Sequence, residues 1–192
     1  TVGAFEHLHA NAQLYVERSA WTLNILGTAG ASYLNGAITG QKVYIVKTGA
    51  APLAIGPDFS AEEGSTIAAN EGVFELRAGQ TMTSMPSYLT LADGVALAGE
   101  GMFGAVDLSK YNLVFPVTKE TADKEAAYTL LTATSVANLA ADSLPQATKD
   151  ALVALNDGET KGQWKLMRQT NADGTVSVIL RWVKNAFLFV IR

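Results

Sequence analysis

Cysteine is absent from this chain of 192 residues. Its absence excludes disulfides, thiolate nucleophiles and cysteine-ligated zinc. Charged residues are also scarce: they make up 17% of the chain, whereas soluble proteins average about 25%. Hydrophobic residues reach 48%. A monomer would therefore have a surface short of charge, and a buried subunit interface would explain this composition.

Clusters of basic residues and long apolar runs are likewise missing. The net charge is −4, so we do not expect direct binding of nucleic acid, which depends on concentrated positive charge. No run approaches the roughly 20 apolar residues that span a bilayer as a helix. The length suits one folded unit, and we interpret residues 1–192 as a single domain.

Short strands dominate the expected secondary structure. Alternating or β-branched runs predict strands at residues 21–26, 43–46 and 73–77, with further short strands near 102–108 and 111–117. Asn35-Gly36 and Asp93-Gly94 are dipeptides typical of hairpin turns, so they predict antiparallel pairs on either side. A last hairpin joins residues 163–169 to residues 175–183.

Helical patterns are fewer. Apolar spacing predicts an amphipathic helix over residues 4–19, and Ser143 with Gln146 forms a capping box that predicts a helix over 143–155. Residues 119–141 are compatible with helix or strand, and we favour helix, which gives a helical insertion over about 119–157. Frequent glycine, proline and charge predict extended loops at residues 49–72 and 77–87.

These elements predict a mainly β (α+β) fold: an antiparallel β-sandwich or barrel-like sheet with an N-terminal helix and a helix near 143–155. We detect no internal repeat of solenoid length. The apolar run at residues 186–191 needs cover from the same chain or from a neighbouring subunit.

Residues suited to metal, phosphate or nucleophilic chemistry do not form a recognisable motif. His7 and His9 would point apart on the expected helix, so we predict no metal site. Gln41 separates Gly40 from Lys42, which breaks the pattern of a phosphate-binding loop. Ser32 lacks the second glycine of a nucleophile elbow.

Carboxylates and tryptophans offer only general possibilities. The spacing of the acidic residues is no more informative than in any acidic β protein; these are Glu62, Glu63, Glu71, Glu75, Asp93, Glu100 and Asp107. Trp21, Trp164 and Trp182 could form a carbohydrate platform, but we favour core positions for them. We therefore predict no catalytic, cofactor-binding or metal-ligating residues, and no cofactor.

The expected function follows from these exclusions. We expect a non-enzymatic structural protein that self-assembles, most concretely a virion component such as a phage capsid, head-decoration or tail-tube subunit assembled in the host cytoplasm. Its partners would be copies of itself and other structural subunits. The alternative is a secreted or surface β-rich binding module, whose tryptophans and residues 80–88 would contact carbohydrate or protein.

Overall fold

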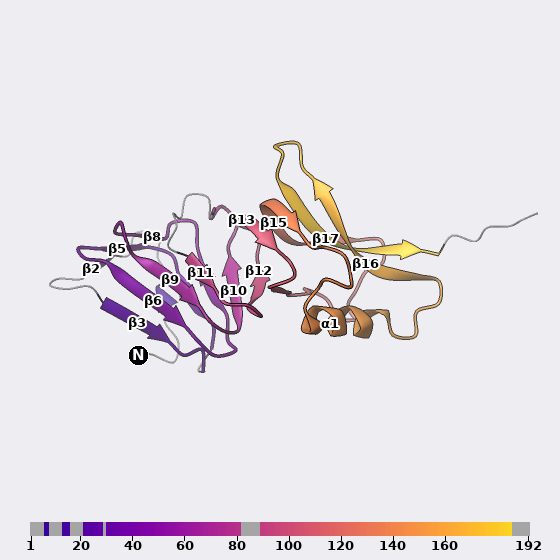
Figure 1. Cartoon of the computed structure of the whole chain (residues 1–192), viewed down its shortest axis with the longest axis horizontal. Coiled ribbons are helices and arrows are strands. Elements are labelled where there is room, and N and C mark those ends of the chain that lie inside the picture. The colour runs from indigo at the N-terminus through magenta and orange to yellow at the C-terminus, as the bar shows by residue number, and fades with distance from the viewer. Residues whose placement is uncertain (1–5, 8–12, 16–20, 29, 82–88, 186–192) are drawn as a thin grey trace, which may run out of the picture.

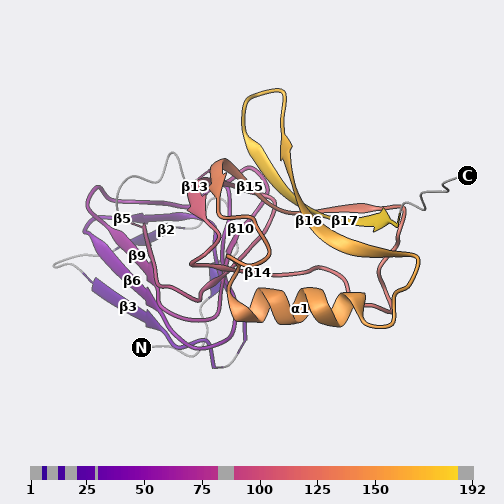
Figure 2. The same ribbon diagram turned by 45° about the vertical axis from the view of Figure 1, so that its right-hand side comes forward.

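The chain winds into a solenoid of short strands, which is followed by a separate sheet with one helix (Figures 1 and 2). The computed structural model describes residues 6–7, 13–15, 21–28, 30–81 and 89–185. Every strand pair in this first part of the chain is parallel, and the strands stack into three sheets, so the first part is a three-sided β-solenoid.

Each turn of the solenoid contributes strands to these sheets in order. Sheet 1 contains β1 (Glu6–His7), β4 (Ser32–Leu34), β7 (Leu53–Ile55), β10 (Val73–Leu76), β12 (Ala96–Ala98) and β14 (Asn112–Leu113). Sheet 2 contains β2 (Gln13–Tyr15), β5 (Ala37–Thr39) and β8 (Ser60–Ala61). Sheet 3 contains β3 (Trp21–Ile25), β6 (Val43–Lys47), β9 (Thr66–Ala69) and β11 (Leu89–Leu91).

Apolar side chains form rows inside the solenoid. In sheet 3, Leu23, Ile45, Ile67 and Leu89 are paired from strand to strand, each 22 residues after the one before. Ile45 is fully buried, and Ile67 is 4% exposed. Because alternate residues of a strand face opposite sides of the sheet, the row buries its apolar groups while its neighbours along each strand face outward. The chain therefore has an internal repeat, and our expectation of none was wrong.

Glycines turn the chain at one corner of the solenoid. Gly27, Gly49, Gly72 and Gly94 follow the strands of sheet 3, and all four have positive φ. At Gly49, with φ of 76°, a Cβ atom would lie 2.0 Å from the backbone oxygen of Leu26 in the preceding turn. At Gly94, with φ of 89°, a Cβ atom would meet nothing within 4 Å.

These two glycines give a matched test of the solenoid corner. We expect Gly94→Ala to cost about 1 kcal/mol, the strain of placing a side chain in the left-handed region. Gly49→Ala adds a backbone clash and should lower the free energy of unfolding by about 1 kcal/mol more. Urea denaturation of both variants measures the difference. Equal losses would contradict the close approach of successive turns at Gly49.

The last part of the chain forms a mixed sheet, called here the terminal sheet. Its strand order is β13 (Met102–Asp107), β15 (Ala127–Ala137), β17 (Val176–Lys184) and β16 (Gly162–Thr170). β13 and β15 are parallel, whereas β17 runs antiparallel to both of its neighbours. The hairpin of β16 and β17 projects away from the solenoid (Figure 1).

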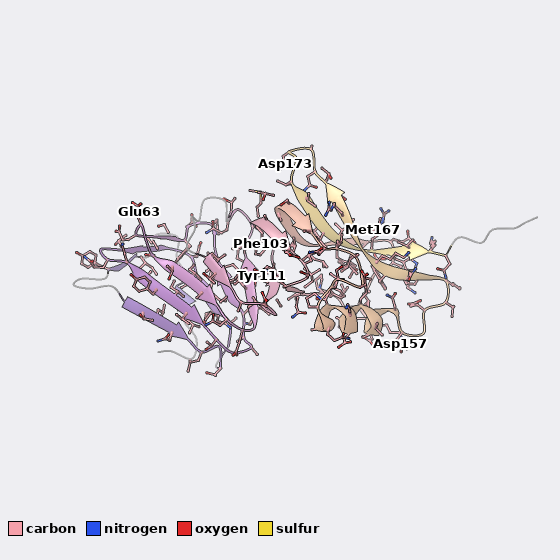
Figure 3. All side chains as sticks on the ribbon, in the orientation of Figure 1. Glu63, Phe103, Tyr111, Asp157, Met167 and Asp173 are labelled. Carbon is pink, nitrogen blue, oxygen red and sulfur yellow. The ribbon has the colours of Figure 1, made fainter. Side chains whose placement is uncertain are left out.

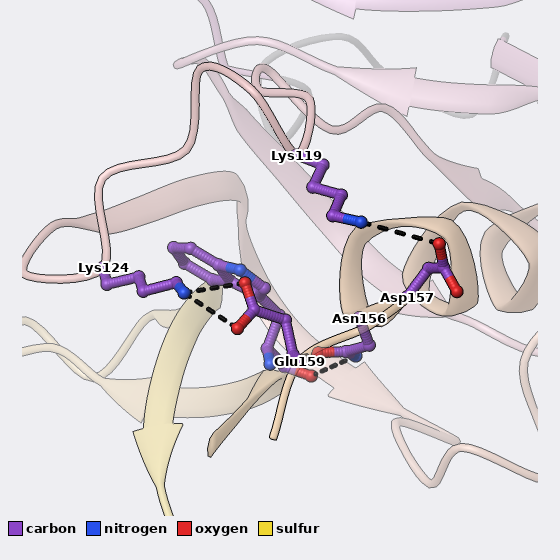
Figure 4. A network of polar contacts seen from close by, with 6 residues as sticks. Lys119, Lys124, Asn156, Asp157 and Glu159 are labelled. Atoms are coloured by element: carbon purple, nitrogen blue, oxygen red, sulfur yellow. Dashed lines mark hydrogen bonds and ion pairs between the residues drawn. The ribbon is translucent and has the colours of Figure 1, made fainter. Parts of the chain in front are cut away.

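Helix α1 (Gln146–Asn156) covers one face of the terminal sheet. The Asn156 side chain fixes the helix end by accepting from the backbone nitrogen of Trp164 at 2.6 Å and donating to its backbone oxygen at 3.0 Å. Two ion pairs join the segment before β15 to the chain at and just after the end of α1 (Figure 4). These are Lys119–Asp157 at 3.5 Å and Lys124–Glu159 at 2.7 Å.

The terminal unit closes one end of the solenoid. The backbone nitrogen of Leu113, in the last strand of sheet 1, donates to the Thr148 hydroxyl of α1 at 3.0 Å. Buried side chains continue without interruption from the solenoid into the terminal unit. Phe103 and Tyr111 lie at the junction between the two parts (Figure 3), and Phe103 is 1% exposed.

The structure confirms that the protein is β-rich and contradicts the expected antiparallel sandwich or barrel with two helices. Asn35-Gly36 joins β4 to β5, and Asp93-Gly94 joins β11 to β12, but in both cases the flanking strands belong to different sheets. Both dipeptides therefore turn corners of the solenoid instead of closing hairpins. The predicted hairpin at residues 163–169 and 175–183 is confirmed by β16 and β17.

The helices and loops predicted from the sequence were also wrong in several places. The expected helix over residues 4–19 is wrong where it is described, since β1 and β2 lie there. Residues 127–137 form a strand in place of the favoured helix, and the expected loop at 49–72 contains three strands. The helix near 143–155 exists as α1, but Pro145 is its N-cap without a side-chain hydrogen bond. Residues 82–88 of the second loop and the run at 186–191 lie outside the described residues.

Candidate functional site

An elongated groove follows the outer face of sheet 1. Tyr33, Ala54, Glu75 and Ala98 occupy equivalent positions on successive strands, because each is paired with the next in the sheet register. Tyr33, Glu75 and Ala98 line the groove, whereas Ala54 is 2% exposed and Pro57, just after β7, lines it in that turn. The groove continues past β14 to Val114, so it crosses five strands. Four strand spacings of about 4.8 Å make this row roughly 19 Å long.

One wall of the groove comes from the terminal sheet. Thr129 and Leu130, near the start of β15, line it opposite the corner that follows β10 and β12. The groove is partly open to solvent, and its volume of about 710 Å³ lies within the range of about 300–1,000 Å³ usual for small-molecule sites. Because the solenoid supplies the floor and the terminal unit supplies a wall, the groove requires both parts of the chain.

Arg77 is held at the centre of the groove by two neighbours. Its Nε lies 3.0 Å from Oε1 of Glu75, and its guanidinium carbon lies 5.7 Å from the centre of the Tyr33 ring. The Arg77 side chain is 55% exposed. No partner for its two terminal nitrogens is found among the described residues, so these donors remain available to a ligand. Glu100 is exposed at the rim.

These groups can recognise hydroxyl-rich ligands. Glu75 and Glu100 accept hydrogen bonds, Arg77 donates several in a fixed fork, and Tyr33 offers an aromatic ring and a hydroxyl. The two carboxylates outnumber the single guanidinium, so the lining favours a neutral or cationic ligand over an anionic one.

The candidate residues from the sequence are dispersed. His7 lies in β1 and His9 lies outside the described residues, and no three metal-ligating side chains gather among the residues described. Ser32 is fully buried on the inner side of sheet 1, away from solvent. Trp164 and Trp182 confirm the core interpretation, since they are 2% and 7% exposed and pack edge to face at 5.7 Å.

Of the seven carboxylates considered, only Glu75 and Glu100 line the groove. Glu62 and Glu71 instead accept hydrogen bonds from backbone nitrogens at solenoid corners. Asp107 accepts from the Asn138 amide at 2.7 Å and also from Ser109. These hydrogen bonds lower the pKa of Asp107. The bond from Asn138 links the end of β13 to the residue that follows β15.

Sequence reasoning missed Tyr33 and Arg77 altogether. The signal that could have found Tyr33 is the recurrence of equivalent positions at 33, 54, 75 and 98, which is visible only once the repeat is known. Comparison with family models, curated proteins and solved structures gave no match. Within the described part of the chain, no helix has the length and apolar character needed to cross a membrane.

Proposed function

We propose that this protein is a non-enzymatic carbohydrate-binding module in which the groove on sheet 1 holds a linear neutral glycan. The observation that carries the proposal is the length of the groove across five strands, with polar side chains and one aromatic ring along its floor. A ligand that fills such a site must be extended and must offer hydrogen-bonding groups repeatedly. A chain of neutral sugars meets both requirements.

The direction of the groove argues against an extended peptide as the ligand. A peptide usually joins a sheet by pairing with an exposed strand edge. This groove runs across the strands of sheet 1, whose inner members already pair with neighbours on both sides. Recognition must therefore come from side chains on the face of the sheet. Tyr33, Arg77 and Glu75 provide it there.

The expected virion role rests on the low charge and high apolar content, on the lack of a catalytic motif and on the expected long loops. The low charge and high apolar content have a simpler explanation in the solenoid, because each turn buries an inward row of apolar side chains. The binding alternative expected the tryptophans to contact the ligand. Trp164 and Trp182 are buried, so we propose the groove as the contact surface in their place.

Oligosaccharide binding tests this function. We expect calorimetry with linear cello-, xylo- and manno-oligosaccharides to detect binding to at least one series, with affinity rising as the chain lengthens until the groove is filled. Tyr33→Ala removes the aromatic contact and should weaken binding about tenfold, which corresponds to a loss of about 1.4 kcal/mol. Thermal melting of the variant separates loss of binding from loss of folding.

Tyr44→Ala is the matched control. Tyr44 faces outward on sheet 3, is 37% exposed and lies outside the groove. The same substitution there should leave affinity unchanged. Absence of binding to every oligosaccharide series, or equal weakening by both substitutions, would refute the proposed function.

A further inference from the structure

Charge is distributed very unevenly along the chain. Residues 161–192 contain six of the fourteen Lys and Arg residues but only one of the eighteen Asp and Glu residues. The other residues therefore contain eight basic and seventeen acidic side chains. Four of the six lie in the hairpin of the terminal sheet: Lys165 and Arg168 in β16, and Arg181 and Lys184 in β17.

Two of these basic residues lie directly opposite each other. Lys165 of β16 pairs with Arg181 of β17 in the sheet register, and both are exposed. Like charges in this arrangement destabilise a sheet. No acidic partner for either residue is found among the described residues. The fold thus keeps an unfavourable pair of charges on this face without neutralising it.

The face that carries the pair is the outer face of the terminal sheet. The alternate residues Trp164 and Trp182 are buried on the opposite face. Met167, labelled in Figure 3, is 39% exposed and lies two residues after Lys165 in β16, so it shares the outer face with Lys165 and Arg181. A shallow hollow of about 420 Å³ adjoins it, lined by basic residues, apolar residues and one acid: Lys124, Glu125, Met167, Arg181, Trp182, Val183 and Lys184. Glu125 lies 3.6 Å from Lys184 and offsets its charge, whereas Lys165 and Arg181 have no such acid among the described residues. This surface, called here the cationic face, combines positive charge with an accessible apolar side chain.

We propose that the cationic face docks onto the acidic solenoid of a second copy of this chain. Charge complementarity supports a second copy as the partner. Exposed acids stand at the corners of the solenoid, including Glu62, Glu63, Glu71 and Asp93. The proposal is independent of glycan binding, because the cationic face does not overlap the groove.

The contact uses different surfaces on the two copies. Such heterologous contacts extend into open chains unless the rotation between copies closes a ring. Strand-to-strand pairing at the β16 edge is disfavoured, because Lys165 and Arg168 would bring like charges together there. Arg168 also folds across the sheet to donate to the backbone oxygen of Val136. Association should therefore be electrostatic and should depend on salt.

Light scattering after size exclusion tests the proposal. At low ionic strength we expect the mass of the wild type to rise with concentration to dimers and larger species. At about 1 M salt, where the Debye length is about 3 Å, we expect a monomer. Lys165→Glu/Arg181→Glu should remain monomeric at low salt at concentrations where the wild type associates. Circular dichroism confirms that the variant keeps its β structure.

The matched control reverses two charges elsewhere. Lys42 and Lys110 are exposed on the solenoid, and Lys42→Glu/Lys110→Glu makes the same change in net charge. This control should associate at least as strongly as the wild type, because it makes the solenoid more acidic. A wild type that stays monomeric at low salt overturns the proposal. Association that persists at about 1 M salt, or in a folded Lys165→Glu/Arg181→Glu variant, overturns it as well.

Discussion

Phe74→Ala is expected to lower the free energy of unfolding by about 4 kcal/mol, near the upper end for a single core substitution. Phe74 is fully buried and is paired with Leu53 on one side and Leu97 on the other. It thus occupies the middle of the inward row of sheet 1. Its truncation leaves a cavity that the turns before and after cannot fill, because each is fixed by its own backbone hydrogen bonds.

Urea denaturation, followed by far-ultraviolet circular dichroism, measures this loss. Phe74→Leu keeps most of the volume and should cost no more than about 1.5 kcal/mol. The buried residues continue from the solenoid into the terminal unit, so we expect one cooperative transition in both variants. A loss below about 1 kcal/mol for Phe74→Ala would contradict the inward position of this side chain.

Local patterns predicted some strands well and their partners poorly. The last hairpin was predictable because its two strands are close in sequence and the turn at Asn171 and Gly174 is strongly marked. Asn35-Gly36 and Asp93-Gly94 carry similar turn chemistry, yet they lead from one sheet into another. A glycine with positive φ suits both a hairpin and a solenoid corner, so the dipeptide alone cannot distinguish them.

The repeat was not detected from the sequence because equivalent positions in successive turns share only a residue type and not an identical residue. Strands of the solenoid are two to five residues long, which gives each turn few positions to compare. One row of sheet 3 contains Ile25, Lys47, Ala69 and Leu91, an apolar row interrupted by a charge. The recurrence of Gly27, Gly49, Gly72 and Gly94 was a clearer signal, and it marks one corner of the coil.

Competition between local preference and long-range pairing explains the misplaced helix. Residues 119–141 contain alanine and charged residues that favour helix, but β15 pairs with both β13 and β17. Pairing of this kind overrides intrinsic propensity. The groove was unpredictable for a related reason: Tyr33, Glu75 and Glu100 come from different turns and meet only through the register of sheet 1.

Lys47→Met is expected to cost about 3 kcal/mol, although methionine fits the same space. Lys47 is fully buried at an inward position of sheet 3. Its Nζ donates to the backbone oxygens of Thr48, Gly49 and Glu71, at 3.1, 2.6 and 3.1 Å. Methionine supplies no donor, so the three carbonyl groups lose these hydrogen bonds at about 1 kcal/mol or more each. Lys47→Ala should cost more, because it also leaves a cavity.

The pH dependence of stability separates the role of the ammonium from that of packing. Burial lowers the pKa of Lys47 below its usual value of 10.5, and the nearby Glu71 carboxylate opposes this shift. The folded protein therefore binds this proton more weakly than the unfolded chain does, so the contribution of Lys47 to stability grows as the pH rises towards 10.5. Denaturation at neutral and alkaline pH should show the advantage of the wild type over Lys47→Met increasing. If the difference in unfolding free energy between the wild type and Lys47→Met stays constant with pH, folding leaves the pKa of Lys47 unchanged. If Lys47→Met is as stable as the wild type, the hydrogen bonds from Lys47 to the three carbonyl groups contribute nothing to the solenoid corner.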